Sequence, residues 1–447
     1  MENEVFTRKQ IRNLVIPLVI EQLLASLMGT ADTMMVSAAG SAAISAVSLV
    51  DAINVLIIHV FSALAAGGSI ICAQYLGRGE RGEANETGRQ LILSVTLLST
   101  VVMIAFIALR APMLRLIFGS VEPDVMSNAQ IYLLITALSY PFIALYNAGA
   151  ALFRVDGNSR LPMTVSTICN LINIGGNALL IFTFKMGAAG AALSTLASRV
   201  LSGVAVMYFL RQEGRIIVVR DYFSIRPQPK RIWNIMAVGV PTGVENGMFQ
   251  FGKLVIQSTV STLGTVAIAA QAMTQTLELL ASNAAMGVGI ALMTVAGRLL
   301  GAGMIAEARV ATRRLCIWAE GTVVVMCALI ALGVEPLTRL CGMEPQAAAM
   351  TVRLTLIICA VKPIVWMTSF IPAYALRAAG DVRFTMLVSS ITMWSCRVVV
   401  ATVLMRAFHT GPLGVWIGMF ADWSVRSVIF LLRLHGDRWT HKRVIDS

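Results

Sequence analysis

The segment 90–110 reads QLILSVTLLSTVVMIAFIALR and carries no charged side chain between its two ends. A helix that crosses the hydrocarbon core of a bilayer needs about 20 mostly apolar residues, and this segment meets that requirement. Breaks at charged residues, glycine and proline define similar runs elsewhere. The runs are too long, and alternate too little, for strands of a membrane barrel. We therefore predict twelve transmembrane helices, near residues 11–36, 45–74, 90–110, 126–151, 161–184, 189–210, 233–261, 266–296, 315–335, 348–375, 384–406 and 413–434.

The composition agrees with an all-α integral membrane protein. The chain is 57% hydrophobic and 13% charged, whereas soluble domains carry about 25% charged residues. The seven cysteines form no Cys-X-X-Cys pair and the four histidines have no metal-ligand spacing, so we expect packing roles for them. No nucleotide-binding P-loop, zinc-protease or nucleophile-elbow motif occurs. We therefore expect a protein that is not an enzyme and has no cofactor.

The distribution of basic residues predicts the orientation. With a cytoplasmic N-terminus, the segments on the cytoplasmic side hold 24 Lys and Arg residues, and those on the opposite side hold 6. Cytoplasmic loops of membrane proteins are enriched in these residues. We predict that both termini are cytoplasmic and that the chain lies in the cell membrane. The same enrichment accounts for the net charge of +12 without a nucleic-acid partner.

The chain repeats itself at an offset of 224 residues. Pro17 and Glu21 correspond to Pro241 and Glu245, and six further short matches follow in the same order, two of them with a slip of one or two residues. Each repeat holds six predicted helices. An even number returns the chain to its starting side, so the repeats are parallel, as in transporters built from two rocking halves. We predict an N-lobe over residues 1–210, a cytoplasmic linker over 211–231 and a C-lobe over 232–447.

Ionisable side chains inside a bilayer are costly, so each is a functional candidate. They are Glu21, Asp32, Asp51, Glu245, Lys253, Glu278, Glu320, Lys362, Arg397, Asp422 and Arg426. Helix rise places Asp32 at nearly the same depth as Asn173, Asn177 and Thr195, within roughly 10–15 Å. A carboxylate, two amides and a hydroxyl suit Na⁺, or a proton on the carboxylate. We predict that these four residues bind the coupling cation.

Two observations bear on this predicted cation site. Asparagine and threonine also hydrogen-bond neighbouring helices in membrane bundles, which is the structural alternative. At an offset of 224, however, the four residues become Ile256, Arg397, Ala401 and Met419. A purely architectural cluster would more often survive duplication, so the cation site is expected in the N-lobe alone.

Three glutamates are candidates for substrate contact or gating. Glu21 and Glu245 occupy equivalent positions one turn after a proline, which favours a hinge or a packing role. Glu278 lies at the repeat position of Asn54 and could contact a substrate or a proton.

Five segments together resemble the multidrug and toxic compound extrusion (MATE) family. They are Asp32–Val36, Gln74–Gly79, Phe153–Gly157, Asn173–Asn177 and Gly187–Thr195. The resemblance covers essentially the whole chain. It implies twelve helices in two lobes, export of cationic drugs against Na⁺ or H⁺, and an N-lobe cation site at Asp32, Asn173, Asn177 and Thr195. Some members also carry acidic residues in the helices equivalent to 233–261 and 348–375. Residues 247–251 read GMFQF and 348–375 contain no Asp or Glu, so no C-lobe cation site is expected.

We therefore expect a monomeric antiporter that exports small organic, cationic compounds across the lipid bilayer. A flippase of lipid-linked precursors is an alternative, because Lys253, Lys362, Arg397 and Arg426 make the second half basic. An ion channel is a third possibility. A channel would need continuous polarity along a pore, whereas the predicted carboxylate cluster lies on one side.

Overall fold

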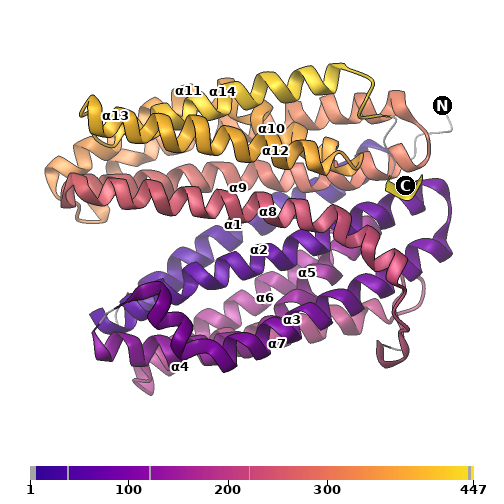
Figure 1. Cartoon of the computed structure of the whole chain (residues 1–447), viewed down its shortest axis with the longest axis horizontal. Coiled ribbons are helices and arrows are strands. Elements are labelled where there is room, and N and C mark those ends of the chain that lie inside the picture. The colour runs from indigo at the N-terminus through magenta and orange to yellow at the C-terminus, as the bar shows by residue number, and fades with distance from the viewer. Residues whose placement is uncertain (1–6, 38–39, 120–121, 221, 441–443, 447) are drawn as a thin grey trace. The chain divides into compact units, whose positions relative to one another are not determined.

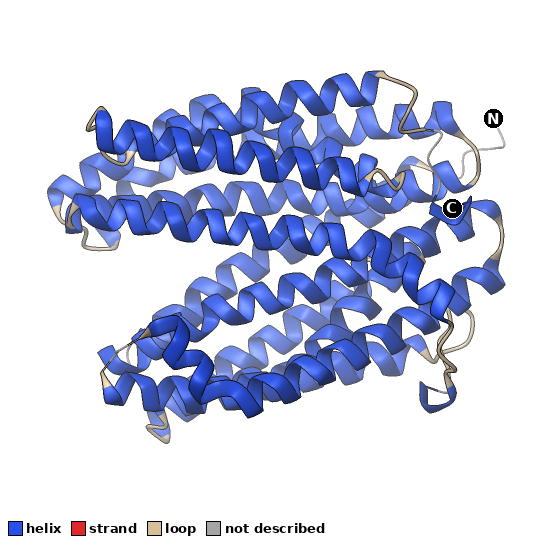
Figure 2. Cartoon of the chain, viewed as in Figure 1, coloured by secondary structure: helices blue, strands red, loops and turns tan. Residues whose placement is uncertain are grey.

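The computed structural model describes residues 7–37, 40–119, 122–220, 222–440 and 444–446. Helices make up almost all of these residues, and no strand occurs among them (Figure 2). The predicted all-α fold class is confirmed. Lys442 and Arg443, which contribute to the predicted basic cytoplasmic tail, lie outside the described residues.

The helices of the first repeat include one π-helical turn, η1, which directly follows α6. They are α1 (Arg8–Ser37), α2 (Ser41–Arg78), α3 (Arg81–Phe118), α4 (Pro123–Leu138), α5 (Tyr140–Val155), α6 (Arg160–Asn177), η1 (Ala178–Thr183) and α7 (Gly187–Leu210). A short 3₁₀ turn, η2 (Tyr222–Ser224), follows in the connecting segment.

The second repeat has the same order of long helices and a second π-helical segment, η4. Its elements are α8 (Pro229–Val260), η3 (Ser261–Leu263), α9 (Thr265–Gly301), α10 (Ile305–Leu340), α11 (Pro345–Ala378), α12 (Val382–Thr392), η4 (Met393–Val400), α13 (Ala401–Ala407) and α14 (Leu413–His435). The last described element is a 3₁₀ turn, η5 (Val444–Asp446).

Ten helices in the described part of the chain are long and apolar enough to cross a membrane, and a bent pair makes eleven. The bent pair is α4 with α5, which meet at an angle of 44° around Ser139, where a single span over 126–151 was predicted. The remaining predicted span, 233–261, corresponds to α8. This helix is 32 residues long but interrupted by polar residues, and it is not among the ten. The number twelve stays a prediction.

Two compact units make up the fold. The N-terminal unit consists of Arg8–Pro17 and Leu24–Gly243, and the C-terminal unit includes Leu18–Leu23 and Val244–Ser447. Helix α1 is therefore divided, because the short stretch after Pro17 belongs to the C-terminal unit. The segment 211–231 and the start of α8 belong to the N-terminal unit.

In the N-terminal unit, α2 packs against α3, α4 and α5, and α7 packs against α4, α5 and α6 (Figure 1). Small residues allow the backbones to approach, as is usual in membrane bundles. A Cβ added at Gly67 of α2 would lie 2.8 Å from the carbonyl oxygen of Ile235 and from the amide nitrogen of Gly239, both in α8. A Cβ at Gly203 of α7 would lie 2.7 Å from the carbonyl oxygen of Phe142 in α5. The second contact fixes α7, which carries Thr195 of the predicted cation site.

In the C-terminal unit, α9, α10 and α11 pack against one another, and α14 packs against α11 and η4 (Figure 1). Gly418 of α14 faces η4 so closely that a Cβ there would lie 2.9 Å from the carbonyl oxygen of Arg397. Gly287 of α9 makes a similar approach to Leu18 of α1, at 2.9 Å from its carbonyl oxygen. The segment Leu18–Leu23 is thus fixed to α9.

Candidate cation site and buried charges

The four residues predicted to bind a cation lie together in the N-terminal unit. Asn177, the last residue of α6, donates a hydrogen bond from Nδ2 to Oδ1 of Asp32 in α1. The same Nδ2 lies 3.5 Å from Oδ1 of Asn173, one turn earlier in α6. Asn173 in turn donates from Nδ2 to Oγ1 of Thr195 in α7, at 3.3 Å. A continuous polar chain therefore joins α1, α6 and α7.

One amide oxygen in this network of polar side chains has no hydrogen-bond donor. Asn177 is fully buried, and its Oδ1 has no hydrogen-bond partner among the described residues. A buried acceptor without a donor is costly, and a bound cation would satisfy it. Ser194, beside Thr195, donates at 2.6 Å to the carbonyl oxygen of Asn173 and locks α6 against α7. The π-helical turn η1 begins directly after Asn177.

A second carboxylate and a guanidinium belong to the same electrostatic environment. Asp51 in α2 repels the carboxylate of Asp32, and Arg199 in α7 attracts it. Asp51 was among the ionisable candidates but was not assigned to the predicted cation site, and Arg199 was missed although it lies inside the predicted span 189–210. A signal for Arg199 was present, because it follows Thr195 by four residues and so shares its helix face.

Asp51 is held by a network of neutral groups. Its Oδ1 accepts hydrogen bonds from Nδ2 of Asn54 and from the hydroxyl of Tyr132, both at 3.1 Å. Asn54 accepts a further hydrogen bond at Oδ1 from Tyr140, at 2.8 Å. Arg199 donates from Nη1 to Oγ of Ser139, at the break between α4 and α5, at 2.9 Å. The bend in this helix pair thus coincides with the polar interior of the unit.

The three candidate glutamates lie in the C-terminal unit and are buried. Glu278 of α9 forms an ion pair with Lys362 of α11, with 2.6 Å between Oε1 and Nζ, and Ser282 bonds to both. Glu245 of α8 pairs with Arg377 of α11 at 2.7 Å. Glu21 lies within the stretch of α1 that belongs to this unit.

A further cluster of charges surrounds Asp422 of α14. Its Oδ1 pairs with Nη2 of Arg426 at 2.8 Å, one turn later in the helix. Its Oδ2 lies 4.0 Å from Nε of Arg397 in η4, which is too far for a hydrogen bond. Arg397 and Lys253 of α8 both lie over the ring of Phe249.

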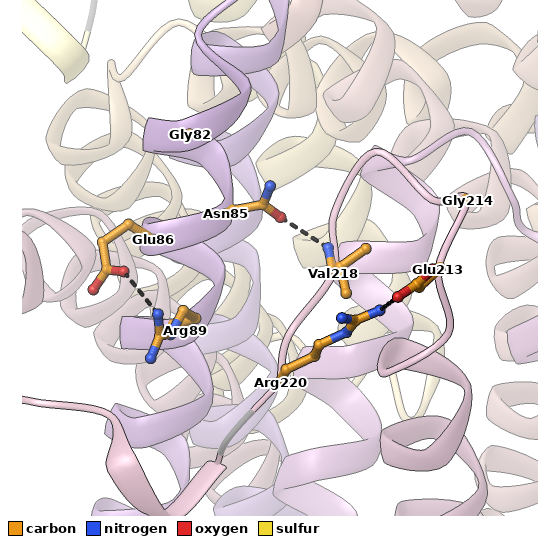
Figure 3. Close-up of a pocket in the computed structure, with 8 residues that line it drawn as sticks. All are labelled: Gly82, Asn85, Glu86, Arg89, Glu213, Gly214, Val218 and Arg220. Carbon is orange, nitrogen blue, oxygen red and sulfur yellow. Dashed lines mark hydrogen bonds and ion pairs between the residues drawn. The ribbon is translucent and has the colours of Figure 1, made fainter.

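A cavity of about 470 Å³ lies at the start of α3, against the segment that follows α7 (Figure 3). Its lining residues are Gly82, Asn85, Glu86, Arg89, Glu213, Gly214, Val218 and Arg220. The charges there are paired with each other: Arg220 contacts Glu213 at 2.5 Å, and Arg89 contacts Glu86 at 3.6 Å. The salt bridge to Arg220 lowers the pKa of Glu213 below its usual value. This balanced lining gives the cavity no preference for ligand charge.

Hydrogen bonds fasten the segment 211–231 to the N-terminal unit. The amide of Val218 donates to Oδ1 of Asn85 at 2.8 Å (Figure 3), and that of Ile216 donates to Oδ1 of Asp156 at 3.0 Å. Further along, Arg231 pairs with Glu83 of α3 at 2.6 Å. The segment expected to be a linker is therefore docked along much of its length.

Two parallel repeats of apolar helices, with a partly buried network of polar side chains in one of them, define a helical membrane transporter. The MatE family model matches residues 17–179 and again 241–403. The chain belongs to this family. The two matched segments begin 224 residues apart, which is the offset at which the sequence repeats, and both predictions, the resemblance and the duplication, are confirmed.

Similar proteins span nearly the same length. A probable multidrug resistance protein NorM from Thermotoga maritima is 27% identical, over 98% of this chain and 94% of the relative. An uncharacterised transporter, YisQ, from Bacillus subtilis is 25% identical, over 95% and 94%. Among solved structures, a crystal structure of MATE in complex with MaD3S superposes with a TM-score of 0.89, covering 98% and 97% at 18% identity. This last likeness concerns the fold.

Proposed function

We propose that the protein is a secondary active efflux transporter that exports small organic, cationic compounds in exchange for Na⁺ or H⁺. The family supports transport, and the name of the Thermotoga relative supports multidrug efflux. In this proposal the protein is a monomer in the cell membrane with both termini in the cytoplasm. The proposed lobes are residues 1–210 and 232–447.

The observation that carries the proposed coupling is the sum of the charges around Asp32 in the interior of the N-terminal unit. Asp32, Asp51 and Arg199 lie within electrostatic range of one another and sum to one negative charge when ionised. An uncompensated charge in a membrane interior costs several kcal/mol. One Na⁺ or one proton neutralises it. The unpartnered Oδ1 of Asn177 offers Na⁺ a second hard oxygen beside the carboxylate.

The divided helix α1 could couple cation binding at Asp32 to a change in the conformation of the protein. Asp32 lies in the part of α1 that belongs to the N-terminal unit, whereas Leu18–Leu23 belongs to the C-terminal unit. Pro17 at the junction lacks the backbone donor that would stiffen the helix there. In the proposed cycle, a cation bound at Asp32 favours one arrangement of α1 and the substrate favours another. Coupling requires this difference in affinity. Glu21, Glu245 and Glu278 are proposed gating or substrate residues.

The test uses purified protein in liposomes loaded with ethidium, a fluorescent organic cation. An imposed gradient of Na⁺ or of pH, at zero membrane potential, is expected to drive net ethidium movement against its concentration gradient. The gradient that works identifies the coupling ion. Ethidium that equilibrates without accumulating would indicate a channel. Absence of movement under both gradients, in protein that elutes as a single species, would contradict the proposal. A parallel assay of lipid-linked sugar translocation tests the flippase alternative.

A further inference from the structure

Two basic side chains of the C-terminal unit meet at one aromatic ring. The Nζ atom of Lys253 lies 5.1 Å from the centroid of Phe249, one turn earlier in α8. The guanidinium carbon of Arg397 lies 4.9 Å from the same centroid. Lys253 and Phe249 are partly exposed, and Arg397 in η4 is buried. The ring brings two like charges together.

The neighbouring acidic residues are already paired with other bases. Glu278 pairs with Lys362, and Asp422 pairs with Arg426. Among the described residues, no carboxylate lies within hydrogen-bonding distance of Lys253 or Arg397, and only the longer ion pair to Oδ2 of Asp422, at 4.0 Å from Nε, reaches Arg397. With Glu278, Lys362, Asp422 and Arg426 counted in, the group carries a net charge of +2 when all six are ionised. The guanidinium of Arg397 contacts Sδ of Met393 at 3.7 Å, and its Nε has no hydrogen-bond partner among the described residues. Buried arginine is normally hydrogen-bonded to a carboxylate, a phosphate or a carbonyl.

The internal repeat shows that this charge replaces a neutral group. Arg397 occupies the position of Asn173, and Lys253 occupies that of Gly29. The carboxylate of Asp32 is replaced by Ile256. The first repeat therefore has one acidic residue among these three positions, and the second has two basic residues at the other two. A role in packing alone would not require arginine there, because the other repeat packs with an amide.

We propose that Lys253, Arg397 and Phe249 form a binding site for the anionic group of an amphipathic molecule. The two cations bind a carboxylate or phosphate, and the ring contacts the apolar or aromatic part next to it. Such a group is present in organic anions and zwitterions that a transporter would carry, and in the headgroup of an anionic lipid. The site lies wholly within the C-terminal unit and does not depend on the proposed coupling cation.

The test measures equilibrium binding without any ion gradient, so its result is independent of whether the protein is an antiporter. The wild-type protein is placed in nanodiscs of phosphatidylcholine. Two fluorescent probes are titrated that differ in one group: 1-pyrenebutyrate, which is anionic, and 1-pyrenebutanol, which is neutral. Charge-assisted hydrogen bonds contribute about 1.5–3 kcal/mol, which corresponds to roughly 10–100-fold in affinity. We expect the butyrate to bind at least about 10-fold more tightly than the butanol.

Substitutions assign this preference to the two residues. Arg397→Asn introduces the residue of the other repeat, and Lys253→Gln changes a partly exposed side chain that the fold tolerates more readily. Each is expected to bring the ratio of the two affinities close to one. Arg397→Lys is expected to keep most of the preference. The matched control is Arg353→Gln in α11, which removes an exposed charge from the same unit and should change nothing.

Anionic lipid distinguishes the two sources of the anionic group. If the site takes a lipid headgroup, phosphatidylglycerol in the nanodisc competes with 1-pyrenebutyrate in the wild-type protein, and the substitutions remove the competition. If it takes a free organic anion, phosphatidylglycerol has little effect. Both outcomes support the site. It would be overturned if the wild-type protein did not distinguish the two probes, or if folded Lys253→Gln protein distinguished them as well as the wild type does.

Discussion

Asn177 donates its side-chain hydrogen bond to Asp32, so an amide at the end of α6 fixes the carboxylate of α1. The two residues lie 145 positions apart in the chain. Most of α1 belongs to the N-terminal unit, and the stretch Leu18–Leu23 belongs to the C-terminal unit. This hydrogen bond is therefore a connection between the divided helix and the polar interior of the N-terminal unit.

Replacing Asp32 with asparagine should abolish gradient-driven export. The amide has nearly the same shape and can still accept the hydrogen bond from Asn177, but it cannot take up a proton or neutralise Na⁺. Ethidium efflux from liposomes is expected to fall to the level of protein-free liposomes, with an unchanged size-exclusion profile. Asp124→Asn, which removes an exposed carboxylate at the start of α4, is the control and should export normally. Efflux at the wild-type rate from Asp32→Asn protein would end the proposal for this residue.

Removing the amide of Asn177 should weaken coupling without abolishing it. Groups that position a cation-binding side chain typically contribute about 10–100-fold to affinity. Asn177→Ala is therefore expected to raise the ion concentration needed for half-maximal efflux by about 10-fold or more. The measurement is efflux as a function of external Na⁺ or pH. Ser198→Ala, in the same unit but hydrogen-bonded to the backbone of its own helix, serves as the control. An unchanged half-maximal concentration would show that the amide has no such role.

For the buried pair of Glu278 and Lys362, we predict that removing one charge lowers stability more than removing both. Lys362→Met leaves a buried carboxylate without its partner, at a cost of about 3–5 kcal/mol in the free energy of unfolding. The double variant Glu278→Gln with Lys362→Met removes both charges and should recover most of this loss. Apparent Tm in detergent is the measurement. If the single variant were as stable as the wild type, Glu278 could not depend on Lys362 for its burial.

Gly67 tests how tightly α2 packs against α8 in the N-terminal unit, and Gly321 of the C-terminal unit is its control. Gly67→Ala would bring a methyl group to 2.8 Å from backbone atoms of α8, which cannot move aside as a side chain could. Such overpacking costs about 1–3 kcal/mol. Gly321→Ala in α10 meets no atom within 4 Å and should be neutral or slightly stabilising. We expect apparent Tm to fall for Gly67→Ala alone. Equal Tm values for the two variants would be inconsistent with the described contact between α2 and α8.

The docking of the segment 211–231 can be tested by limited proteolysis. Asn85→Ala removes the side chain that accepts the hydrogen bond from the amide of Val218. Trypsin should then cut faster after Arg215 and Arg220, because local opening exposes both bonds. Asn128→Ala, which loses a hydrogen bond within α4, should leave the cleavage rate unchanged. Equal rates for both variants would mean that Asn85 does not hold the segment.

Hydropathy and internal similarity were sufficient to predict the fold class and the repeat. The apolar run around Val101 needs no knowledge of its neighbours to be identified as a membrane helix. Hydropathy was less informative about helix boundaries, because these depend on local breaks and on single polar residues. Hydropathy alone did not divide the run 126–151 at Ser139, although Pro141 at the start of α5 is a helix-breaking residue there. Helix α8 carries polar residues that make its span ambiguous.

Depth along the helices predicted which polar residues could meet, but not how the helices are rotated. Depth placed Asp32 level with Asn177, and the structure joins them. It could not show that Tyr132 faces Asp51, since that depends on two helices 81 residues apart turning toward each other. Lys362 was recognised as a buried charge, but its partner Glu278 is 84 residues away. The functional role of Asp32, Asn173, Asn177 and Thr195 stays a prediction.

The π-helical turn after Asn177 affects any reading of the helix that contains it. A π-helix holds an extra residue in its turn, and each residue of an α-helix advances by about 100° around the axis. Side chains within Ala178–Thr183, the last turn of this helix, therefore advance by a smaller angle per residue than those before Ala178. A helical wheel drawn through residues 160–184 as one α-helix assigns lipid-facing and interior-facing positions wrongly within the π-helical turn. Mutational scans and labelling sites along this helix should be numbered in two separate frames.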